Sequence, residues 1–325
     1  MESIPKKTCL KKIFWGMRYN FKILGIGQSV PSNIVTNEDI EQITPGSKSE
    51  WIYDKLGIKQ RRVVVGEDVV SLGVDSAKEA LQDAGMSASD IDLIVVNTSS
   101  ADRISPSVAC MIQNEIGARC PSFDINAVCS GFMYSMQLVT SMFSTYKNVL
   151  MISTETYSKI TNWDDRNSCF FGDGSASLVV TKSDFPNLDI SLGADGTGWE
   201  NFNCDRKSTF NMNGKEVYKF GVETLPREIN KLTTKLDLRI DDIDYLVPHQ
   251  PSHNVLKETA RLLGMSEDRV CFNMGDYANT AGASVPMALY KLIKDGTVMN
   301  NDTLLLAAIG SGWTYGVGVL KLDYK

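Results

Sequence analysis

An internal repeat is the feature of this sequence that most restricts its possible folds. The segment SDIDLIVVNTSSADRISPSVACMIQNEIG at residues 89–117 parallels DDIDYLVPHQPSHNVLKETARLLG at residues 241–264. Each copy has an acidic lead-in, an apolar strand pattern, a polar turn and a helix pattern that ends at glycine. Two further pairs follow in the same order: NVLMISTE (148–155) with DTLLLAAIG (302–310), and SASLVVTK (175–182) with YGVGVLKL (315–322). The matched order predicts two similar α/β halves.

The strand patterns indicate how these halves are layered. The apolar runs at residues 93–96 and 304–309 are continuous, which favours strands covered by helices on both faces. A helix pattern over residues 71–85 ends at a glycine, as helices commonly do. The resulting expectation is an N-terminal extension over residues 1–20, a first half over 21–182 and a second half over 183–325.

Composition and charge exclude several classes of protein. Hydrophobic residues make up 43% and charged residues 22% of the 325-residue chain, which is ordinary for a soluble globular protein. The formal net charge is −6 and no long basic stripe interrupts the body of the chain, so nucleic acid is not an expected partner. No apolar segment reaches the roughly 18 residues of a membrane-spanning helix, so no membrane association is expected either.

Cysteine usage indicates the compartment. The seven cysteines form no CxxC pair, which argues against disulfides and structural zinc and favours a reducing environment. The first 20 residues are basic but lack a long apolar core and a signal cleavage site, and Met17 is a possible alternative start. We therefore expect a cytoplasmic protein without a metal.

Cys129 is the first candidate for chemistry. It follows the strand pattern SFDI and stands at the start of the helix pattern SGFMYSMQLVTSMF. Ligands of such sheets gather at the carboxyl ends of strands, and a helix N-terminus favours a thiolate over a thiol. Free cysteines are nevertheless often buried packing residues. Cys129 alone is compatible with both roles.

The two histidines have different prospects. His249 closes a strand of the repeat, at an edge where it can face Cys129 across the join of the halves. His253 follows four residues later, but Pro251 lies between them and no glutamate follows His249. An HExxH metal site is therefore excluded, and His253 is interpreted as structural.

Asn279 is the third candidate. It precedes a run of small residues in GDYANTAGASVPMAL, where an asparagine is ordinarily a cap or turn residue. Its position in the second half corresponds closely to that of Cys129 in the first. The repeat thus predicts that both residues meet near the centre of the molecule.

Several motifs together resemble one known family. They are EWIYDKLGIKQRR, DINAVCSGF, FFGDGSASLVV, LVPHQ, GDYANTAGASVPMAL and GSGWTYG. The sequence from about Phe21 to the C-terminus is similar to β-ketoacyl-acyl-carrier-protein synthase III, a thiolase-fold condensing enzyme. The resemblance implies two pseudo-symmetric halves in a layered αβαβα architecture, a homodimer, and no permanently bound cofactor.

The resemblance also implies roles for the candidate residues. Cys129 would carry the acyl group, and His249 with Asn279 would polarise the second thioester. A thiolate can store an acyl group as an enzyme thioester, which divides one condensation into two easier steps. Decarboxylation of a malonyl thioester would then leave an enolate that needs neutral or cationic donors. The backbone N–H groups of Cys129 and Ser311 are similar to the family's oxyanion hole.

Substrate handling follows the family less closely. Trp51 and Arg166 match the positions that hold the adenine of coenzyme A, whereas Lys55 stands where the family has arginine. The family's Ala-Asn-x-Arg after the HQ pair is here PSHN at residues 251–254. This departure removes a supporting amide and an arginine that docks the carrier protein. The acyl donor therefore stays open between a CoA and a carrier-protein thioester, with acyl-CoA as an expected partner and an acyl carrier protein as a possible one.

Three functions remain open at this stage. The leading interpretation is a decarboxylating condensation of an acyl group with a malonyl thioester. The altered PSHN segment instead favours an acyltransferase that moves the acyl group to a hydroxyl or amine. A papain-like hydrolase also orders its residues Cys, His, Asn, but the repeat and the missing CGSCW-type motif argue against it. Ser105, Met212 and Phe210 are the residues expected to influence the acyl tunnel.

Overall fold

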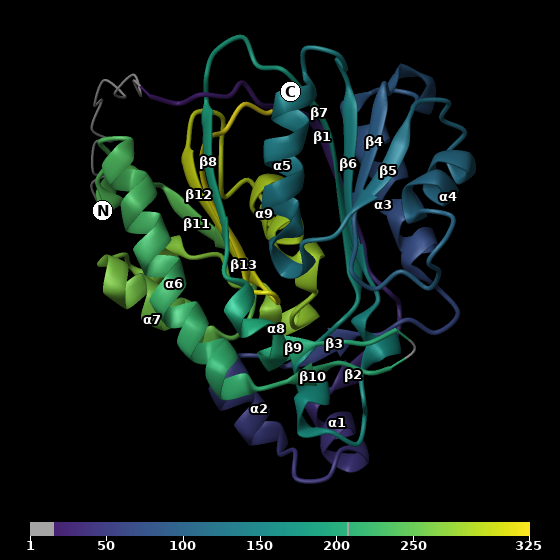
Figure 1. Cartoon of the computed structure of the whole chain (residues 1–325), viewed down its shortest axis with the longest axis vertical. Coiled ribbons are helices and arrows are strands. Elements are labelled where there is room, and N and C mark those ends of the chain that lie inside the picture. Colours follow the sequence, from purple (N-terminus) through teal and green to yellow (C-terminus); the bar gives the residue numbers. More distant parts are fainter. Residues whose placement is uncertain (1–15, 207) are drawn as a thin grey trace, which may run out of the picture.

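Two β-sheets lie face to face with helices between them and on both outer sides (Figure 1). The structure, a computed structural model, describes residues 16–206 and 208–325. The strands of the first sheet, in spatial order, are β1 (Lys22–Ser29), β7 (Gly174–Thr181), β6 (Val149–Glu155), β4 (Leu93–Asn97) and β5 (Ser122–Ile125). Those of the second are β8 (Leu188–Ala194), β13 (Thr314–Lys321), β12 (Thr303–Gly310) and β11 (Tyr245–Pro248).

The two sheets share one topology. In the first, β1, β7 and β6 pair antiparallel, and β6, β4 and β5 pair parallel. In the second, β8, β13 and β12 pair antiparallel, and β12 pairs parallel with β11. A parallel bridge from Leu246 to Val270 occupies the place that β5 has in the first sheet. The predicted repeat is therefore a repeat in three dimensions.

The helices complete a five-layered arrangement. Two helices pack between the sheets, α5 (Gly131–Met142) and α9 (Ser284–Lys294). The outer face of the first sheet carries α3 (Val69–Ala84) and α4 (Val108–Glu115). The second sheet is covered by α6 (Gly214–Lys235), which packs on α7 (His253–Leu263).

Smaller elements gather at one end of the sheets, at the bottom of Figure 1. They are α1 (Asn37–Ile43), α2 (Ser49–Leu56), β2 (Ile34–Thr36), β3 (Gln60–Arg62), β9 (Phe202–Asn203), β10 (Asn211–Met212) and α8 (Met274–Tyr277). β2 pairs with β3 and β9 with β10, each antiparallel.

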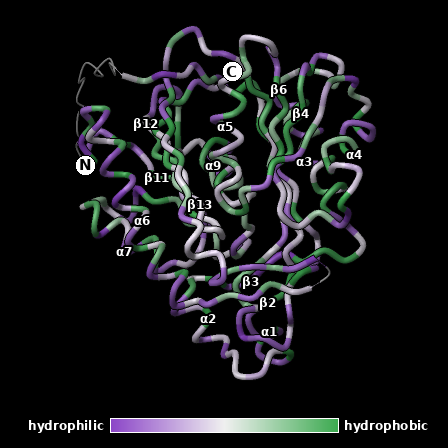
Figure 2. The backbone as a smooth tube through the Cα atoms, viewed as in Figure 1, coloured by the Kyte–Doolittle hydropathy of each residue, from purple (hydrophilic) through white to green (hydrophobic). Residues whose placement is uncertain are grey.

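The strand cores are buried on both faces, as the continuous apolar runs predict. Every residue of β4, β6 and β12 is buried. Figure 2 shows these strands as predominantly hydrophobic, whereas the outer helix α6 carries many hydrophilic residues. The helix predicted over residues 71–85 is α3, which ends at Gly85 in the left-handed conformation that glycine favours.

The chain from residue 16 onward is part of the fold. Met17 is buried, Tyr19 forms a β-bridge with Leu188, and Arg18 forms a salt bridge with the buried Asp189. Residues 16–20, expected to end an N-terminal extension, thus pack against β8 of the second sheet. The other residues of that expected extension lie outside the described residues. Within residues 16–206 and 208–325, no helix has both the length and the apolar character of a membrane span.

Candidate active site

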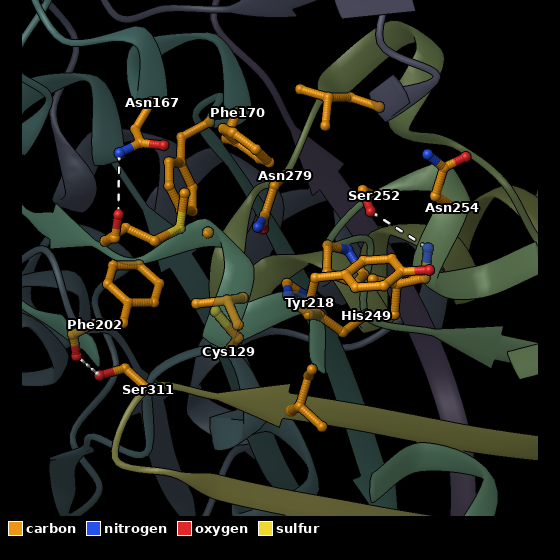
Figure 3. A pocket seen from close by; sticks show the side chains of 18 of the residues that line it. Cys129, Asn167, Phe170, Phe202, Tyr218, His249, Ser252, Asn254, Asn279 and Ser311 are labelled. Atoms are coloured by element: carbon orange, nitrogen blue, oxygen red, sulfur yellow. Dashed lines mark hydrogen bonds between the residues drawn. The ribbon is translucent and has the colours of Figure 1, made fainter. Parts of the chain in front are cut away.

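One cavity collects every sequence-predicted site residue. Its volume is about 400 Å³, and it opens among α2, α6 and α7. Its lining includes all six predicted residues: Trp51, Cys129, Arg166, His249, Asn279 and Ser311. Figure 3 shows the side chains of Cys129, His249 and Asn279 pointing toward one another although they come from different elements and from both halves.

Cys129 lies on a sharp turn between β5 and α5. The 3₁₀ turn at Val128–Ser130 begins with Val128 at φ 49°, a left-handed conformation that is strained for a β-branched residue. The side chain of Asn126 holds this turn by accepting a hydrogen bond from the backbone N–H of Val128 at 3.1 Å. We call residues 126–131 the first elbow. It places the thiol at the cavity floor, where Cys129 is only 2% exposed.

The position of Cys129 before a helix favours a thiolate, and the electrostatics of the folded site act in the opposite direction. Burial raises the pKa of this thiol well above its usual value, and the nearby carboxyl of Glu155 raises it further. A hydrogen bond from the residue's own backbone N–H acts in the opposite direction but is weaker. The helix α5 begins only at Gly131. Burial and the Glu155 carboxyl therefore favour the thiol form of Cys129.

His249 is fixed immediately after β11. Its backbone N–H donates to Ala307 of β12 at 2.7 Å. The next residue, Gln250, is buried, and its side chain bonds to the carbonyls of Pro248 and Cys271 and to the backbone N–H of Asn273. This explains structurally why a glutamine follows the histidine.

The ring of His249 is neutral in this environment. Burial lowers its pKa to about 3, and a backbone hydrogen bond with Ala281 opposes this shift only in part. The ring nitrogen Nδ1 is buried and has no hydrogen-bond partner within the described residues.

Asn279 is held by the first half of the chain. Its backbone N–H donates to Phe170 at 3.0 Å, and its carbonyl accepts from Gly172 at 3.1 Å, which forms a bridge to the FFGDG segment. Its side-chain Oδ1 accepts the backbone N–H of Ala281 at 2.8 Å. Because the oxygen is committed to this turn, the Nδ2 amide is the group left to donate to a ligand.

The true counterpart of Cys129 in the second half is Gly282. The 3₁₀ turn Ala281–Ala283 leads into α9 as Val128–Ser130 leads into α5, and Ala281 has φ 45°. Asn279 stands three residues before Gly282, as Asn126 stands before Cys129. Asn279 therefore lies close to the counterpart of Cys129, as predicted, but three residues before it. We call residues 279–284 the second elbow.

The end of β12 closes the cavity beside the thiol. A Cβ atom at Gly310 would lie 3.0 Å from the backbone nitrogen of Cys129, so only glycine permits this close approach. The next residue, Ser311, lines the cavity and donates its hydroxyl to the carbonyl of Phe202. The Ser311 loop and the Cys129 backbone thus lie side by side.

The cavity entrance carries aromatic and basic side chains. The Arg166 guanidinium carbon lies 3.8 Å from the centre of the Trp51 ring, and Lys55 lines the same entrance. From the altered segment after Gln250, Ser252 caps α7 by accepting the backbone N–H of Val255. His253 packs edge-on against Phe272 with ring centres 4.7 Å apart.

Aromatic side chains wall the acyl side of the site. A buried cluster joins Cys129 to the residues Tyr157, Phe171, Phe202, Phe210, Met212 and Trp313. Phe210 and Met212, which were expected to influence the acyl tunnel, both belong to this cluster, and Met212 also lines the cavity. Ser105 does not line this cavity, because it is exposed on the loop before α4.

Sequence reasoning missed two residues of the site. One is Asn126, whose signal is the pair of matching stretches NAVC and NTAG. The other is Glu155, a buried carboxyl at the end of β6. An acidic residue directly after the apolar run VLMIST was the available signal. No group of three or more His, Cys, Asp or Glu side chains in the described part of the chain is arranged to hold a metal ion.

Comparison with known proteins identifies the family. The profile described as "3-Oxoacyl-[acyl-carrier-protein (ACP)] synthase III" matches residues 123–196, and its C-terminal counterpart matches residues 233–322. A β-ketoacyl-[acyl-carrier-protein] synthase III of Clostridium acetobutylicum is 37% identical, over 92% of this chain and 98% of the relative. One from Oceanobacillus iheyensis is 38% identical, over 93% and 99%.

Solved structures agree with the sequence relatives. The 3-oxoacyl-[acyl-carrier-protein] synthase III of Aquifex aeolicus has a TM-score of 0.89 and 34% identity, over 93% of this chain and 99% of that one. The priming β-ketosynthase of the R1128 polyketide pathway has a TM-score of 0.89 and 28% identity, over 94% and 97%. The predicted thiolase-like fold is confirmed, and the chain belongs to the β-ketoacyl-[acyl-carrier-protein] synthase III family of condensing enzymes.

Proposed function

We propose that this enzyme loads an acyl group onto Cys129 and condenses it with a malonyl thioester to give a β-ketoacyl product. The observation that carries the proposal is the convergence of Cys129, His249 and Asn279 on one cavity floor. A thiol from the first half and two amide- or imidazole-type donors from the second match the needs of a two-step condensation.

The first step is transfer of the acyl group. The Cys129 sulfur, on losing its proton, attacks the carbonyl carbon of an acyl thioester, and the thiol of the donor leaves. The tetrahedral intermediate carries a negative oxygen, for which the backbone N–H groups of Cys129 and Ser311 are the proposed donors. Their proximity at the end of β12 supports this assignment.

The second step forms the new carbon–carbon bond. A malonyl thioester loses CO₂, and the electron pair of the broken bond passes into an enolate. The Nδ2 amide of Asn279 and the neutral ring of His249 would donate hydrogen bonds to the enolate oxygen. A ring with its pKa lowered to about 3 stays neutral at working pH, so it stabilises charge as a hydrogen-bond donor. The enolate carbon then attacks the acyl thioester, which releases the Cys129 thiolate.

The entrance residues support coenzyme A as the donor. Trp51 and Arg166 would hold the adenine ring, because an aromatic face and a planar guanidinium both stack on a base. Lys55 supplies a positive charge for phosphate at the same entrance. We assign no permanently bound cofactor, and acyl-CoA and a malonyl thioester enter as substrates.

The proposal also includes the molecule that accepts the acyl group from Cys129. Relatives are named synthases of acyl-carrier-protein products, so a malonyl carrier protein is the proposed partner. Pro251, Ser252 and Asn254 of the altered segment line the same cavity. Their difference from the family pattern favours, as second candidate, an acyltransferase that uses a hydroxyl or amine acceptor.

A homodimer and a cytoplasmic location complete the proposal. The strand β5 ends the first sheet, and its residues are only partly buried, which leaves a sheet edge for a second copy of the chain. Light scattering should then report about twice 35.9 kDa. We also propose residues 21–182 and 183–325 as the two halves of each subunit.

The experiment that tests the function separates its two steps. Intact-mass spectrometry after incubation with a panel of acyl-CoAs should show one acyl adduct. Release of ¹⁴CO₂ from malonyl-CoA or a malonyl carrier protein should follow. A different result would favour the acyltransferase. In that case the acyl-enzyme forms, neither malonyl-CoA nor malonyl carrier protein releases CO₂, and the acyl group passes to an alcohol or amine.

A further inference from the structure

Glu155 is a fully buried carboxyl that the proposed chemistry leaves unused. It ends β6, and its side chain accepts the backbone N–H and the hydroxyl of Ser99 at 3.1 and 3.0 Å. The hydroxyl of Ser100 donates to it at 2.5 Å. The hydroxyl of Thr98 donates at 3.5 Å, and a backbone hydrogen bond from Gly282 adds a fifth donor. A buried group with so many donors is held in a single position.

The carboxyl lies where the two elbows meet. A Cβ atom at Gly282 would stand 3.0 Å from Oε1 of Glu155 and also 3.0 Å from the carbonyl oxygen of Val128. Val128 directly precedes Cys129, and Gly282 is its counterpart on the second elbow. Glu155 therefore touches the backbone of one elbow and approaches the other beside the thiol.

The charge of Glu155 changes within the pH range of an ordinary enzyme. Burial raises its pKa to about 7, although the hydrogen bonds from Ser100 and Ser99 partly oppose this shift. The ionised form raises the pKa of Cys129. The carboxyl and the thiol are thus coupled acids.

Among the described residues, the titratable groups near the carboxyl include Tyr157 and the buried Asp173, which directly precedes Gly174, the strand partner of Glu155. Tyr157 from the turn after β6 is buried, and its hydroxyl bonds to Ser99 at 3.0 Å. Burial, Cys129 and Glu155 all raise the pKa of Tyr157, so it stays protonated. The neighbouring strand β7 contributes Gly174, the second elbow contributes Gly282, and the loop after β4 contributes Ser99 and Ser100, none of which titrates.

We propose that Glu155 is a positioning residue that sets the pH range over which Cys129 becomes a thiolate. Protonated, it stays bonded to the second elbow and to the loop after β4 without opposing the thiolate. Ionised, it places a negative charge beside the sulfur and raises the cost of losing the thiol proton. The inference rests on Cys129 as the nucleophile of the proposed function.

Alkylation by iodoacetamide measures this coupling directly. The Cys129 thiolate displaces iodide and forms a thioether, so the rate at each pH reports the thiolate fraction. Peptide mapping would assign the rate to Cys129 between pH 5.5 and 9.5. In the unmodified enzyme we expect the logarithm of the rate to rise with pH, to flatten as Glu155 ionises near pH 7, and then to rise again.

The variant Glu155→Gln keeps the shape and removes the charge. Its profile should rise with a single slope, and its rate at pH 8.5 should exceed that of the unmodified enzyme about tenfold, because a neighbouring like charge shifts a pKa by about one unit or more. The matched control is Asp173→Asn, a buried carboxyl that bonds to Ser158 and to the backbone of Val64. That variant should retain the flattened profile.

A second variant keeps the proposal testable if Glu155→Gln fails to fold. Ser100→Ala removes a donor that stabilises the carboxylate, so Glu155 should ionise at higher pH and the flattened region should move upward. Identical profiles for the unmodified enzyme, Glu155→Gln and Ser100→Ala would overturn the inference. Failure of acyl loading in the unmodified enzyme, with the alkylation profiles shifted as expected, would overturn the proposed function and leave the role of Glu155 intact.

Discussion

The two elbows have the same backbone and different side chains. Each has an asparagine whose Oδ1 accepts the N–H of the residue two positions later, a residue with positive φ, and a helix that follows. The first elbow presents Cys129 at its tip, whereas the second presents Gly282. Asn126 is exposed, whereas Asn279 is 6% exposed and lines the cavity.

This difference shows how a duplicated fold can divide the work of one site. The first elbow supplies the nucleophile at its tip. The second elbow has no side chain at its tip, because a Cβ atom at Gly282 would lie 2.3 Å from Nδ2 of Asn97. It presents the amide of Asn279 to the cavity instead. The same local structure thus provides a covalent group in one half and a hydrogen-bond donor in the other.

The largest expected effect is the loss of acyl loading when the reactive side chain at the tip of the first elbow is removed. Cys129→Ala should abolish acyl loading, since no other cysteine stands on an elbow. Intact mass after acyl-CoA treatment measures the loss, and Cys204→Ala, at an exposed cysteine, is the control that should load normally. An acyl group mapped to Cys110 or Cys169 in the unmodified enzyme would contradict the assignment.

The next effect compares the two turn asparagines. Asn279→Ala should slow ¹⁴CO₂ release from the malonyl thioester by roughly 10²- to 10³-fold, the usual effect of removing one such donor, while acyl loading persists. Asn126→Ala deletes the equivalent turn on the first elbow. It should cost about 1 kcal/mol of stability and leave CO₂ release within a few-fold of the unmodified enzyme.

Equal loss of CO₂ release in both asparagine variants would contradict the assignment of a donor role to Asn279 and a structural role to Asn126. It would mean that the turn itself, and not the amide facing the cavity, is what the second step requires. Thermal unfolding of both proteins should accompany the rate measurements, so that a general loss of structure is recognised.

The smallest expected effect concerns the tip of the second elbow. Gly282→Ala would force the methyl group against Asn97, Glu155 and Val128. Such overpacking typically costs 1–3 kcal/mol, measured as a lower free energy of unfolding in urea. At Gly196 a Cβ atom meets nothing within 4 Å and φ is not left-handed, so Gly196→Ala should be nearly neutral. A neutral Gly282→Ala would show that the elbows are not packed as described.

The sequence was sufficient for the layered fold because its signals are local. The apolar runs of β4 and β12 and the glycine after α3 reflect burial and capping, which depend on neighbouring residues. The repeat then placed His249 at a strand end facing the first half. The family resemblance, and no local pattern, brought Trp51 and Arg166 to the entrance.

The properties that sequence reasoning could not supply arise only from tertiary packing. The repeat placed Asn279 close to the counterpart of Cys129, but only the positive φ of Val128 and Ala281 shows that Asn279 matches Asn126 and that Gly282 matches Cys129. The position of Cys129 before a helix favours a thiolate, but its burial and the charge of Glu155, which arise from tertiary packing, raise the pKa of the thiol. Glu155 lies 26 positions along the chain from Cys129, and no pattern in the intervening sequence predicts that the two residues lie close together.

The backbone bridge between Phe171 and Asn279 also bears on how the protein folds. Its partners are separated by more than a hundred residues, and contacts of such long range form slowly because a large loop must close first. The second elbow takes its final position only when the FFGDG segment is already in place. We therefore expect catalytic competence to appear late in refolding, after most of the secondary structure has formed.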